Sequence, residues 1–309
     1  MNCTICKSEK TTIVNAVDLQ TNDSFAYTHC NNCGVVYLQK LLEDYSKYYS
    51  ENYYSFNNKS GFIARLKYLR DVYAFSNKGL IGKIIYLIQP NTNLYSLRYL
   101  NLKPNKTLLD IGCGDGKEIK VLHQLHYPFV RGIDPFIKSD IIINNYVIVE
   151  KKDIFSIKEK FDFLTMHHAF EHVSNPVDVC RKLKSLLNPD GKILIRIPVA
   201  SCFAYEHFKQ DWVQFDAPRH IFLHTTKSIE LICKSTGLEI ESVIYDSTSF
   251  QFWGSELVKK GIPIHSASSK QIFISRFKSL LKGDGLKSKQ LNQNKLGDQA
   301  IYIIRHSSQ

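Results

Sequence analysis

Short apolar runs alternate with amphipathic stretches through the middle of the chain. Five runs of strand length are rich in Leu, Ile, Val and Phe, which predicts buried β-strands. They span residues 107–111, 129–134, 146–150, 161–166 and 192–198. One helix is predicted over 117–125, and another begins near Pro176 and closes at the Asn-Pro-Asp-Gly turn of 188–191. Strands that alternate with helices predict an α/β fold with a doubly wound, mostly parallel sheet.

The composition places this fold in a soluble chain with a basic surface. Of 309 residues, 44% are hydrophobic and 22% charged, and no apolar run approaches the roughly 20 residues of a membrane-spanning helix. We see no signal peptide and expect a cytoplasmic protein. The net charge is +11, and residues 251–309 carry ten Lys and Arg against three Asp and Glu. Such a surface favours anionic partners, or it is a solvated face that keeps the protein soluble.

Four of the eight cysteines fall within the first 33 residues, as two C-x-x-C pairs. The pairs are Cys3 with Cys6 and Cys30 with Cys33. Two such pairs close a tetrahedron of thiolates, which selects zinc in a cytosolic chain. Because all four positions are sulfur, no position is open to water or substrate. The sequence therefore predicts a structural zinc that holds a small N-terminal element, with free or redox cysteines as the alternative.

A glycine-rich turn follows the first strand. Gly112, Gly114 and Gly116 lie between the strand and the 117–125 helix, where glycines let the backbone approach a ligand closely. An acid, Asp110, precedes them, and Asp134 ends the next strand, where an acid can accept hydrogen bonds from a ribose diol. The pattern predicts a nucleotide site. Taken alone, Asp110 is equally compatible with a cap for the following helix.

LLDIGCGDG, GIDP, KKDIF, EHV and LLNPDGKILIRIP occur in this order from about Leu97 onward. In that order they resemble the class I S-adenosylmethionine-dependent methyltransferases. The resemblance implies a Rossmann-like, mostly parallel seven-stranded sheet, with segments 238–245 and 299–305 as an antiparallel edge. One departure is the short link from Pro135 to Tyr146, where the family usually has a full helix.

The resemblance also implies cofactor contacts at the matched positions. These are Asp110, Gly112 and Gly114 at the methionyl end, Asp134 at the ribose hydroxyls, Asp153 at the adenine amino group, and Ile154 or Phe155 against the purine. An ordinary loop acid is the alternative for Asp153.

The string HHAFEHV, residues 167–173, contains the inverted zinc-protease pattern H-x-x-E-H. Metal ligands of that kind lie one turn apart on a single helix. Here the string follows the fourth strand, so His167 and His168 continue the strand or a turn, and Glu171 and His172 begin a short helix. We therefore do not expect a metalloprotease. His168 is a candidate for contact with the methyl acceptor, and His172 is expected to be structural.

After the fifth strand, Asp216-Ala-Pro-Arg219-His220 resembles an element of small-molecule methyltransferases from bacterial glycan and secondary-metabolite pathways, a branch that includes proteins with a zinc element. Sugar C-methyltransferases of this kind carry Glu-His where this chain has Arg-His. We expect His220 to act as general base and Arg219 to hold an anionic part of the acceptor. The alternative is that both side chains satisfy backbone carbonyls beneath a loop.

We expect three parts: a zinc element over 1–42, an aromatic helical link or lid over 43–100, and a methyltransferase domain over 101–309. The aromatic pairs at 48–49 and 53–54 in the link form either a lid or core. A basic insertion over 251–297 contains an apolar stripe of Phe273, Phe277, Leu280 and Leu281. We expect its helix to pack on the domain, with a membrane-surface helix as the alternative.

The sequence thus predicts an enzyme that methylates an oxygen or carbon of a small-molecule, sugar or glycan-precursor acceptor, free or linked to a nucleotide or lipid. The alternatives are an RNA methyltransferase with a zinc RNA-binding element, and a non-catalytic binding protein that keeps the fold. The sequence leaves the acceptor and the oligomeric state open.

Overall fold

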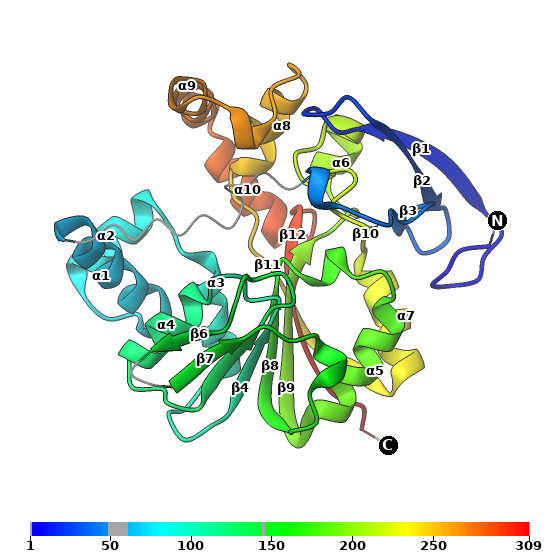
Figure 1. The fold of residues 1–309 in the computed structure, drawn as a ribbon. Coiled ribbons are helices and arrows are strands. Elements are labelled where there is room, and N and C mark those ends of the chain that lie inside the picture. Colours follow the sequence, from blue (N-terminus) through cyan, green and yellow to red (C-terminus); the bar gives the residue numbers. More distant parts are fainter. Residues whose placement is uncertain (1, 49–60, 144–145, 309) are drawn as a thin grey trace.

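The computed structural model describes residues 2–48, 61–143 and 146–308. Within them the chain forms two sheets, a large central one and a smaller one that contains the N-terminal strands (Figure 1). Tyr49, Tyr53 and Tyr54 of the predicted aromatic link lie outside the described residues. No described helix combines the length and apolar character that crossing a bilayer requires.

In the described residues the central sheet has eight strands, in the order β11-β12-β9-β8-β4-β5-β7-β6. Its strands are β4 (Leu108–Ile111), β5 (Val130–Ile133), β6 (Ile141–Ile143), β7 (Tyr146–Glu150), β8 (Phe161–His167), β9 (Leu187–Pro198), β11 (Leu238–Tyr245) and β12 (Gln299–His306). The five predicted central strands are parallel, and β12 pairs antiparallel with both β9 and β11. The predicted fold class is confirmed, with a correction to the strand count.

Two local predictions need correction. The link after Pro135 contains an additional strand, β6, because its β-branched Ile141–Ile143 run pairs antiparallel with β7. That pairing raises the expected seven strands to eight. The segment 188–191 is not a separate turn, because β9 begins at Leu187 and carries a register shift opposite β8.

Helices cover both faces of the central sheet (Figure 1). Two hydrophobic cores result. One lies between the sheet and helices α5 and α7, and the other lies between the sheet and the helices on its opposite face. The helices are α5 (Pro176–Leu186) and α7 (Thr226–Thr236) on one face, and α1 (Phe62–Ser76), α2 (Leu80–Ile88), α3 (Thr92–Ser96), η2 (Leu97–Leu100) and α4 (Lys117–Gln124) on the other. Local signals fix their ends: the Asn175 side chain caps α5, and Gly237 ends α7 in the left-handed conformation.

The N-terminal strands form a small sheet together with a strand from the second half of the chain. This sheet consists of β1 (Thr11–Val17), β2 (Ser24–Cys30), β3 (Val36–Leu38) and β10 (Phe222–Leu223), in that order. The last strand comes from the segment directly after Asp216–His220, so the two parts of the chain share a sheet and a core that includes Tyr27, Trp212 and Phe215. Further short elements nearby are η1 (Ser46–Tyr48), α6 (Phe203–Phe208) and η5 (Lys209–Asp211). Whether the expected boundary at residue 42 separates two domains stays a prediction.

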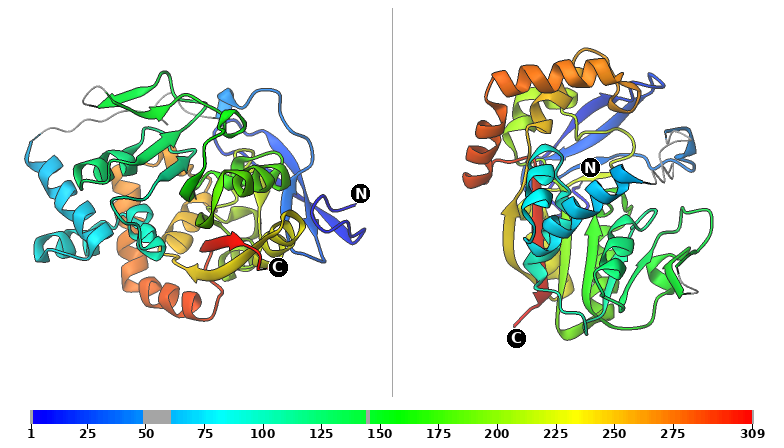
Figure 2. Two further views of the ribbon diagram at one scale, coloured as in Figure 1. Left: turned by 90° about the horizontal axis from the view of Figure 1, so that it is seen from below. Right: turned by 90° about the vertical axis from the view of Figure 1, so that its left-hand side faces the viewer.

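The predicted insertion lies between β11 and β12 and is helical. It comprises α8 (Phe250–Val258), η6 (Ile264–Ser266), α9 (Ser269–Leu281) and α10 (Asp284–Gln293). α9 lies at the periphery of the molecule (Figure 2). Its apolar stripe does not pack on the domain as expected, since Phe273, Phe277, Leu280 and Leu281 are 51–74% exposed. The bend into α10 instead buries Ser279, whose hydroxyl donates to Asp284 at 2.6 Å.

Candidate active site

The glycine turn between β4 and α4 has no room for side chains at its start. Gly112 has φ +72°, and a Cβ there would lie 2.6 Å from the Cβ of Ala169, in the turn after β8. Its N–H donates to the Ile133 carbonyl at 2.8 Å, which ties the turn to β5. The turn therefore packs against the HHAFEHV segment and presents its backbone at the carboxyl ends of the strands.

A cavity of about 530 Å³ opens at this edge of the sheet. Five of the six predicted cofactor positions line it: Gly112, Gly114, Asp134, Asp153 and Ile154. Two exposed aromatic rings, Phe136 and Phe155, also line it. The sequence interpretation had included Phe155 but missed Phe136, although its position directly after GIDP is a usable signal.

Asp110 is not among the residues that line this cavity, and its expected contact with the methionyl end stays a prediction. Its side chain lies beneath the glycine turn, where Oδ1 accepts a 2.7 Å hydrogen bond from the Thr165 hydroxyl and lies 3.6 Å from His167 Nδ1. Asp110 does not cap the following helix, because Gly116 is the N-cap of α4. Asp110 thus connects the floor of the turn to β8.

The two remaining acids, Asp134 and Asp153, line the cavity and also accept hydrogen bonds from nearby backbone N–H groups. Asp134 accepts hydrogen bonds from the N–H groups of Gly114 at 2.9 Å and Phe136 at 2.8 Å. Each carboxylate oxygen has two lone pairs, so a ribose hydroxyl can still bind there. Asp153 caps the short helix η3 (Ile154–Ser156) by accepting from Phe155 N–H at 2.8 Å.

A second cavity of about 240 Å³ adjoins the first. Its walls come from residues 16–20, at the end of β1 and the start of the loop after it, from residues 212–220, and from α8 and the segment that follows it. His168 and His172 line both cavities. The N-terminal element therefore shapes a cavity, which the sequence interpretation missed because the contact joins segments about 200 residues apart.

The string HHAFEHV bends as expected. β8 ends at His167, His168 has φ +50°, and the short helix η4 (Phe170–His172) begins after the bend. His168 and His172 therefore do not share a helix, and the metalloprotease pattern is not formed. Glu171, which the sequence interpretation left without a role, is fully buried beside His168, His172 and His220.

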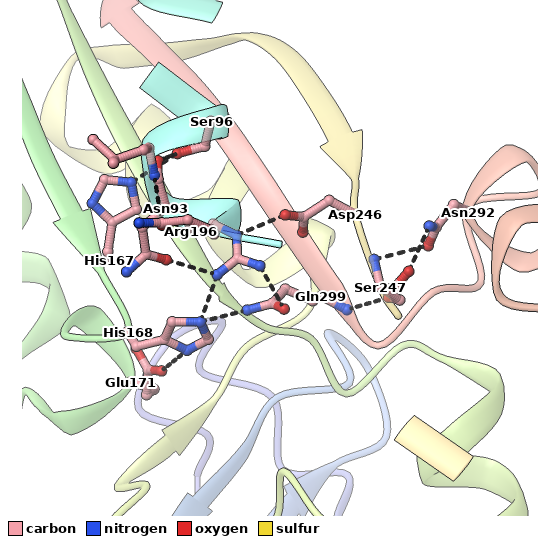
Figure 3. A network of polar contacts seen from close by, with 12 residues as sticks. Asn93, Ser96, His167, His168, Glu171, Arg196, Asp246, Ser247, Asn292 and Gln299 are labelled. Atoms are coloured by element: carbon pink, nitrogen blue, oxygen red, sulfur yellow. Dashed lines mark hydrogen bonds and ion pairs between the residues drawn. The ribbon is translucent and has the colours of Figure 1, made fainter. Parts of the chain in front are cut away.

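His168 is held by partners at both ring nitrogens (Figure 3). Its Nε2 accepts from Arg196 Nη1 and Gln299 Nε2, both at 2.7 Å, so the ring proton is on Nδ1, 3.3 Å from Glu171 Oε1. Burial, with the charge of Arg196, lowers the pKa of His168 despite Glu171. The Nε2 lone pair of His168 is therefore already engaged by Arg196 and Gln299.

His220 and Arg219 both contact backbone carbonyls, as the alternative interpretation held. His220 Nδ1 lies 2.8 Å from the Gln214 carbonyl oxygen, and Arg219 Nη1 donates to the Tyr48 carbonyl. Arg219 also forms a two-pronged ion pair with Asp216, with Nε to Oδ2 at 2.9 Å. Its guanidinium is thus engaged within the protein, and the expected hold on an anionic acceptor stays a prediction. The Nε2 of His220, by contrast, lies near two carboxylates, 3.9 Å from Glu171 Oε1 and 3.8 Å from Asp216 Oδ2.

The N-terminal cysteines come together as predicted. Their four sulfur atoms lie within 4.8 Å of one another, with Cys3 to Cys33 at 3.7 Å and Cys6 to Cys30 at 3.4 Å. Tetrahedral zinc with Zn–S bonds of about 2.3 Å has sulfur–sulfur edges of about 3.8 Å. The four sulfurs therefore fit a metal ion of this kind.

Residues 82–243 match a family model described as a methyltransferase domain. The ubiquinone biosynthesis O-methyltransferase of Glaesserella parasuis serovar 5 is 31% identical over 132 residues, covering 37% of this chain and 54% of that protein. The tRNA U34 carboxymethyltransferase of Nautilia profundicola is 28% identical over 110 residues, covering 31% of this chain and 35% of that protein. These alignments thus span about a third to a half of the relatives. Among solved structures, an O-methyltransferase from a trans-AT PKS multienzyme of Brevibacillus brevis has a TM-score of 0.47 at 12% identity, covering 77% of this chain and 79% of that chain.

Proposed function

Because this chain belongs to the methyltransferase-domain family, we propose that it transfers a methyl group from S-adenosylmethionine to a small-molecule, sugar or glycan-precursor acceptor. One observation carries the proposal: two cavities, one on the glycine turn and one beneath the N-terminal element, adjoin at His168 and His172. A donor and an acceptor bound in them would meet at that junction, as an in-line transfer requires.

The larger cavity is assigned to the donor. Gly112 and Gly114 would face the methionyl end, Asp134 would accept hydrogen bonds from the ribose hydroxyls, and Asp153 would face the adenine amino group. The purine would pack between Phe155, Ile154 and Phe136. This assignment is supported by the fact that all these residues line the same cavity, at the carboxyl edge of the sheet.

The smaller cavity is assigned to the acceptor. At about 240 Å³ it lies below the range of about 300–1,000 Å³ typical of drug-sized ligands, so it suits one sugar ring or small aromatic group. A nucleotide or lipid carrier would then extend outside it. The acceptor's charge stays open, because Arg219 is engaged by Asp216. Oxygen is the favoured methylated atom, since an O-methyltransferase is among the relatives, and carbon remains the alternative.

In O-methylation the acceptor oxygen forms a bond to the methyl carbon as the sulfur–methyl bond breaks. The sulfonium becomes a neutral thioether, and the hydroxyl proton is released. His220 is placed to receive it. The Gln214 carbonyl accepts from its Nδ1–H, which leaves the Nε2 lone pair available, and ionised Glu171 would stabilise the imidazolium that forms. His168 and Arg219 act as positioning residues, His168 on Glu171 and Arg219 on the segment that contains His220.

We assign structural zinc to the four N-terminal cysteines. The site is closed, so its role is to stabilise the β1–β3 region rather than to bind substrate. Hydrogen bonds connect that region to the acceptor side. Among them, Tyr27 donates to the His220 carbonyl at 3.0 Å, and Thr225 donates to the Cys33 carbonyl. Zinc would therefore help to fix the acceptor cavity.

The relative that acts on tRNA gives the RNA alternative a specific basis. Against it, the N-terminal element forms a wall of a small cavity instead of a separate binding module. Salt-sensitive retention of tRNA in a gel shift would support the RNA alternative. The non-catalytic alternative predicts no methyl transfer to any acceptor despite a filled cofactor cavity.

The decisive experiment for the proposal is calorimetric titration of the zinc-containing protein with S-adenosylmethionine and S-adenosylhomocysteine. We expect both to bind in a 1:1 ratio, and isotope-labelled methyl groups to appear on members of a panel of hydroxylated small molecules and sugar nucleotides. Absence of S-adenosylmethionine binding to a folded, zinc-containing sample would refute the proposed function.

A further inference from the structure

One carboxylate and two imidazoles lie close together where the two cavities adjoin. Glu171 is 0% exposed, and neither of its carboxylate oxygens receives a hydrogen bond from the described residues. One ligand atom from each of Glu171, His172 and His220 lies within 4.8 Å of the other two. The cluster joins two elements far apart in sequence, η4 and the segment after η5.

Backbone carbonyls fix the tautomers of the two imidazoles. The Arg219 carbonyl oxygen lies 2.7 Å from His172 Nδ1, and the Gln214 carbonyl oxygen lies 2.8 Å from His220 Nδ1. A carbonyl oxygen only accepts, so each Nδ1 bears the hydrogen and each Nε2 presents a lone pair. The cluster thus combines a buried carboxylate with two lone pairs.

The protein's own cations do not relieve this arrangement among the residues described. Arg196 stands behind His168, and its guanidinium is bonded to Asp246, Asn93, Gln299 and His168 (Figure 3). Arg219 is paired with Asp216. The His168 N–H lies 3.3 Å from Glu171 Oε1, but in a geometry short of a hydrogen bond. A buried carboxylate without donors is costly, so a cation bound beside Glu171 would stabilise the cluster.

We propose that Glu171, His172 and His220 bind one divalent first-row transition cation of the Zn²⁺ or Fe²⁺ class. Two imidazoles and one carboxylate are a ligand set that these cations use while keeping positions open, whereas Mg²⁺ and Ca²⁺ prefer oxygen ligands alone. The two Nδ1–H to carbonyl contacts are the outer hydrogen bonds that orient metal-binding histidines.

This site would narrow the acceptor class, a step that rests on the proposed function. Because His172 and His220 line the smaller cavity, open positions on the cation would face the acceptor. Acceptors with two adjacent oxygens, such as vicinal diols, catechols or 2-hydroxycarboxylates, can occupy two such positions. The cation would lower the pKa of a bound hydroxyl. His220 would then be a ligand, and the released proton would pass to water instead of to the imidazole.

The test uses the full chain with zinc on its four cysteines and titrates Co²⁺ by calorimetry, with metal content measured after desalting. The wild-type protein should bind one further equivalent, and its melting temperature should rise when Co²⁺ is added. Glu171→Gln and His172→Asn should each weaken Co²⁺ binding at least about 100-fold, since even residues outside the ligand set cost about 10–100-fold. His207→Asn, an exposed histidine that stacks on Phe203, is the matched control and should bind as the wild type does.

Binding of S-adenosylmethionine is measured on the same samples and reports folding and the donor cavity independently. If that binding is normal and no further Co²⁺ equivalent binds, or Glu171→Gln binds Co²⁺ like the wild type, the cation site is refuted and the methyltransferase proposal stands. If Co²⁺ binds as expected and S-adenosylmethionine does not, the cation site stands and the proposed function fails.

Discussion

The backbone N–H of Gly114 donates a 2.9 Å hydrogen bond to Asp134 Oδ2, which links the glycine turn to the end of β5 across the larger cavity. Asp134→Ala removes this link and the proposed acceptor for the ribose hydroxyls. Hydrogen bonds to a charged group contribute about 1.5–3 kcal/mol, so S-adenosylmethionine affinity should fall about 10–100-fold. Calorimetric titration measures the change.

Asp190→Ala is the control, because Asp190 is exposed and does not line the cavity. It should bind the donor as the wild type does. Equal affinities for Asp134→Ala and the wild type would show that the donor does not use this acid.

His220 should matter for turnover and little for the donor. His220→Asn keeps a polar side chain but removes the Nε2 lone pair that faces Glu171, so methyl transfer should fall about 100-fold or more. Donor affinity should stay within about twofold, since His220 does not line the larger cavity. Single-turnover rates with a labelled methyl donor measure the effect, with His207→Asn as control. A turnover loss of less than about threefold would remove His220 from the reacting centre.

The sequence was informative where a local pattern decides the outcome. The five central strands and the position of Gly112, Gly114, Asp134 and Asp153 at one sheet edge follow from strand periodicity and from the parallel direction of the strands. The bend after His167 was predicted in the same way, from its position directly after the fourth strand. Each prediction needed only the residues within one strand–turn–helix unit.

The errors come from pairings between distant segments. The contact of Arg219 with the Tyr48 carbonyl, and the pairing of β10 with β3, depend on how segments far apart in the sequence dock. The exposure of the α9 stripe is likewise set by what lies beside the helix, and an amphipathic pattern is the same with or without a partner. Glu171 had no role in the sequence interpretation because His220 comes to it only in the fold.

Loss of one zinc-binding cysteine should affect the acceptor side. Cys33→Ser should abolish stoichiometric zinc and lower the melting temperature, because the four sulfurs hold the loops beside β2 and β3. Methyl transfer should fall as well, since the Cys33 carbonyl accepts from Thr225 and the same region lines the smaller cavity. Zinc analysis and thermal unfolding measure the outcome.

Cys233→Ala, in the core between the central sheet and α5 and α7, is the control and should retain one zinc. Retention of zinc by Cys33→Ser would contradict the four-sulfur site.

We predict that the exposed stripe on α9 contacts anionic membranes. Phe277 and Leu281 are 51% and 72% exposed, with Arg276 and Lys278 on the same helix. Full burial of one such side chain contributes about 1.5–3 kcal/mol, so Phe277→Ser with Leu281→Ser should reduce vesicle binding at least about tenfold. Flotation with anionic vesicles measures this, and binding should weaken as salt increases.

Leu286→Ser is the matched control, because Leu286 is 73% exposed but lies on α10. Flotation of this variant should equal that of the wild type. If the wild-type protein does not float with anionic vesicles, α9 has a different partner.

The final prediction concerns pH and a buried acid. Asp298 is 2% exposed, accepts a 3.1 Å hydrogen bond from the Trp212 indole, and burial raises its pKa to about 6. Between about pH 4 and pH 6 the folded protein therefore keeps a proton that the unfolded chain has lost. The free energy of unfolding should fall through this window, by about 3 kcal/mol in total, and stay flat above it.

Asp298→Asn keeps an acceptor for Trp212 without the charge. The variant and the wild type should have nearly the same free energy of unfolding at pH 4. At pH 8 that of the variant should be higher by about 3 kcal/mol. Urea unfolding at both pH values measures the difference, with the exposed Asp190→Asn as control. A difference that is the same at both pH values would show that Asp298 ionises without cost in the folded protein.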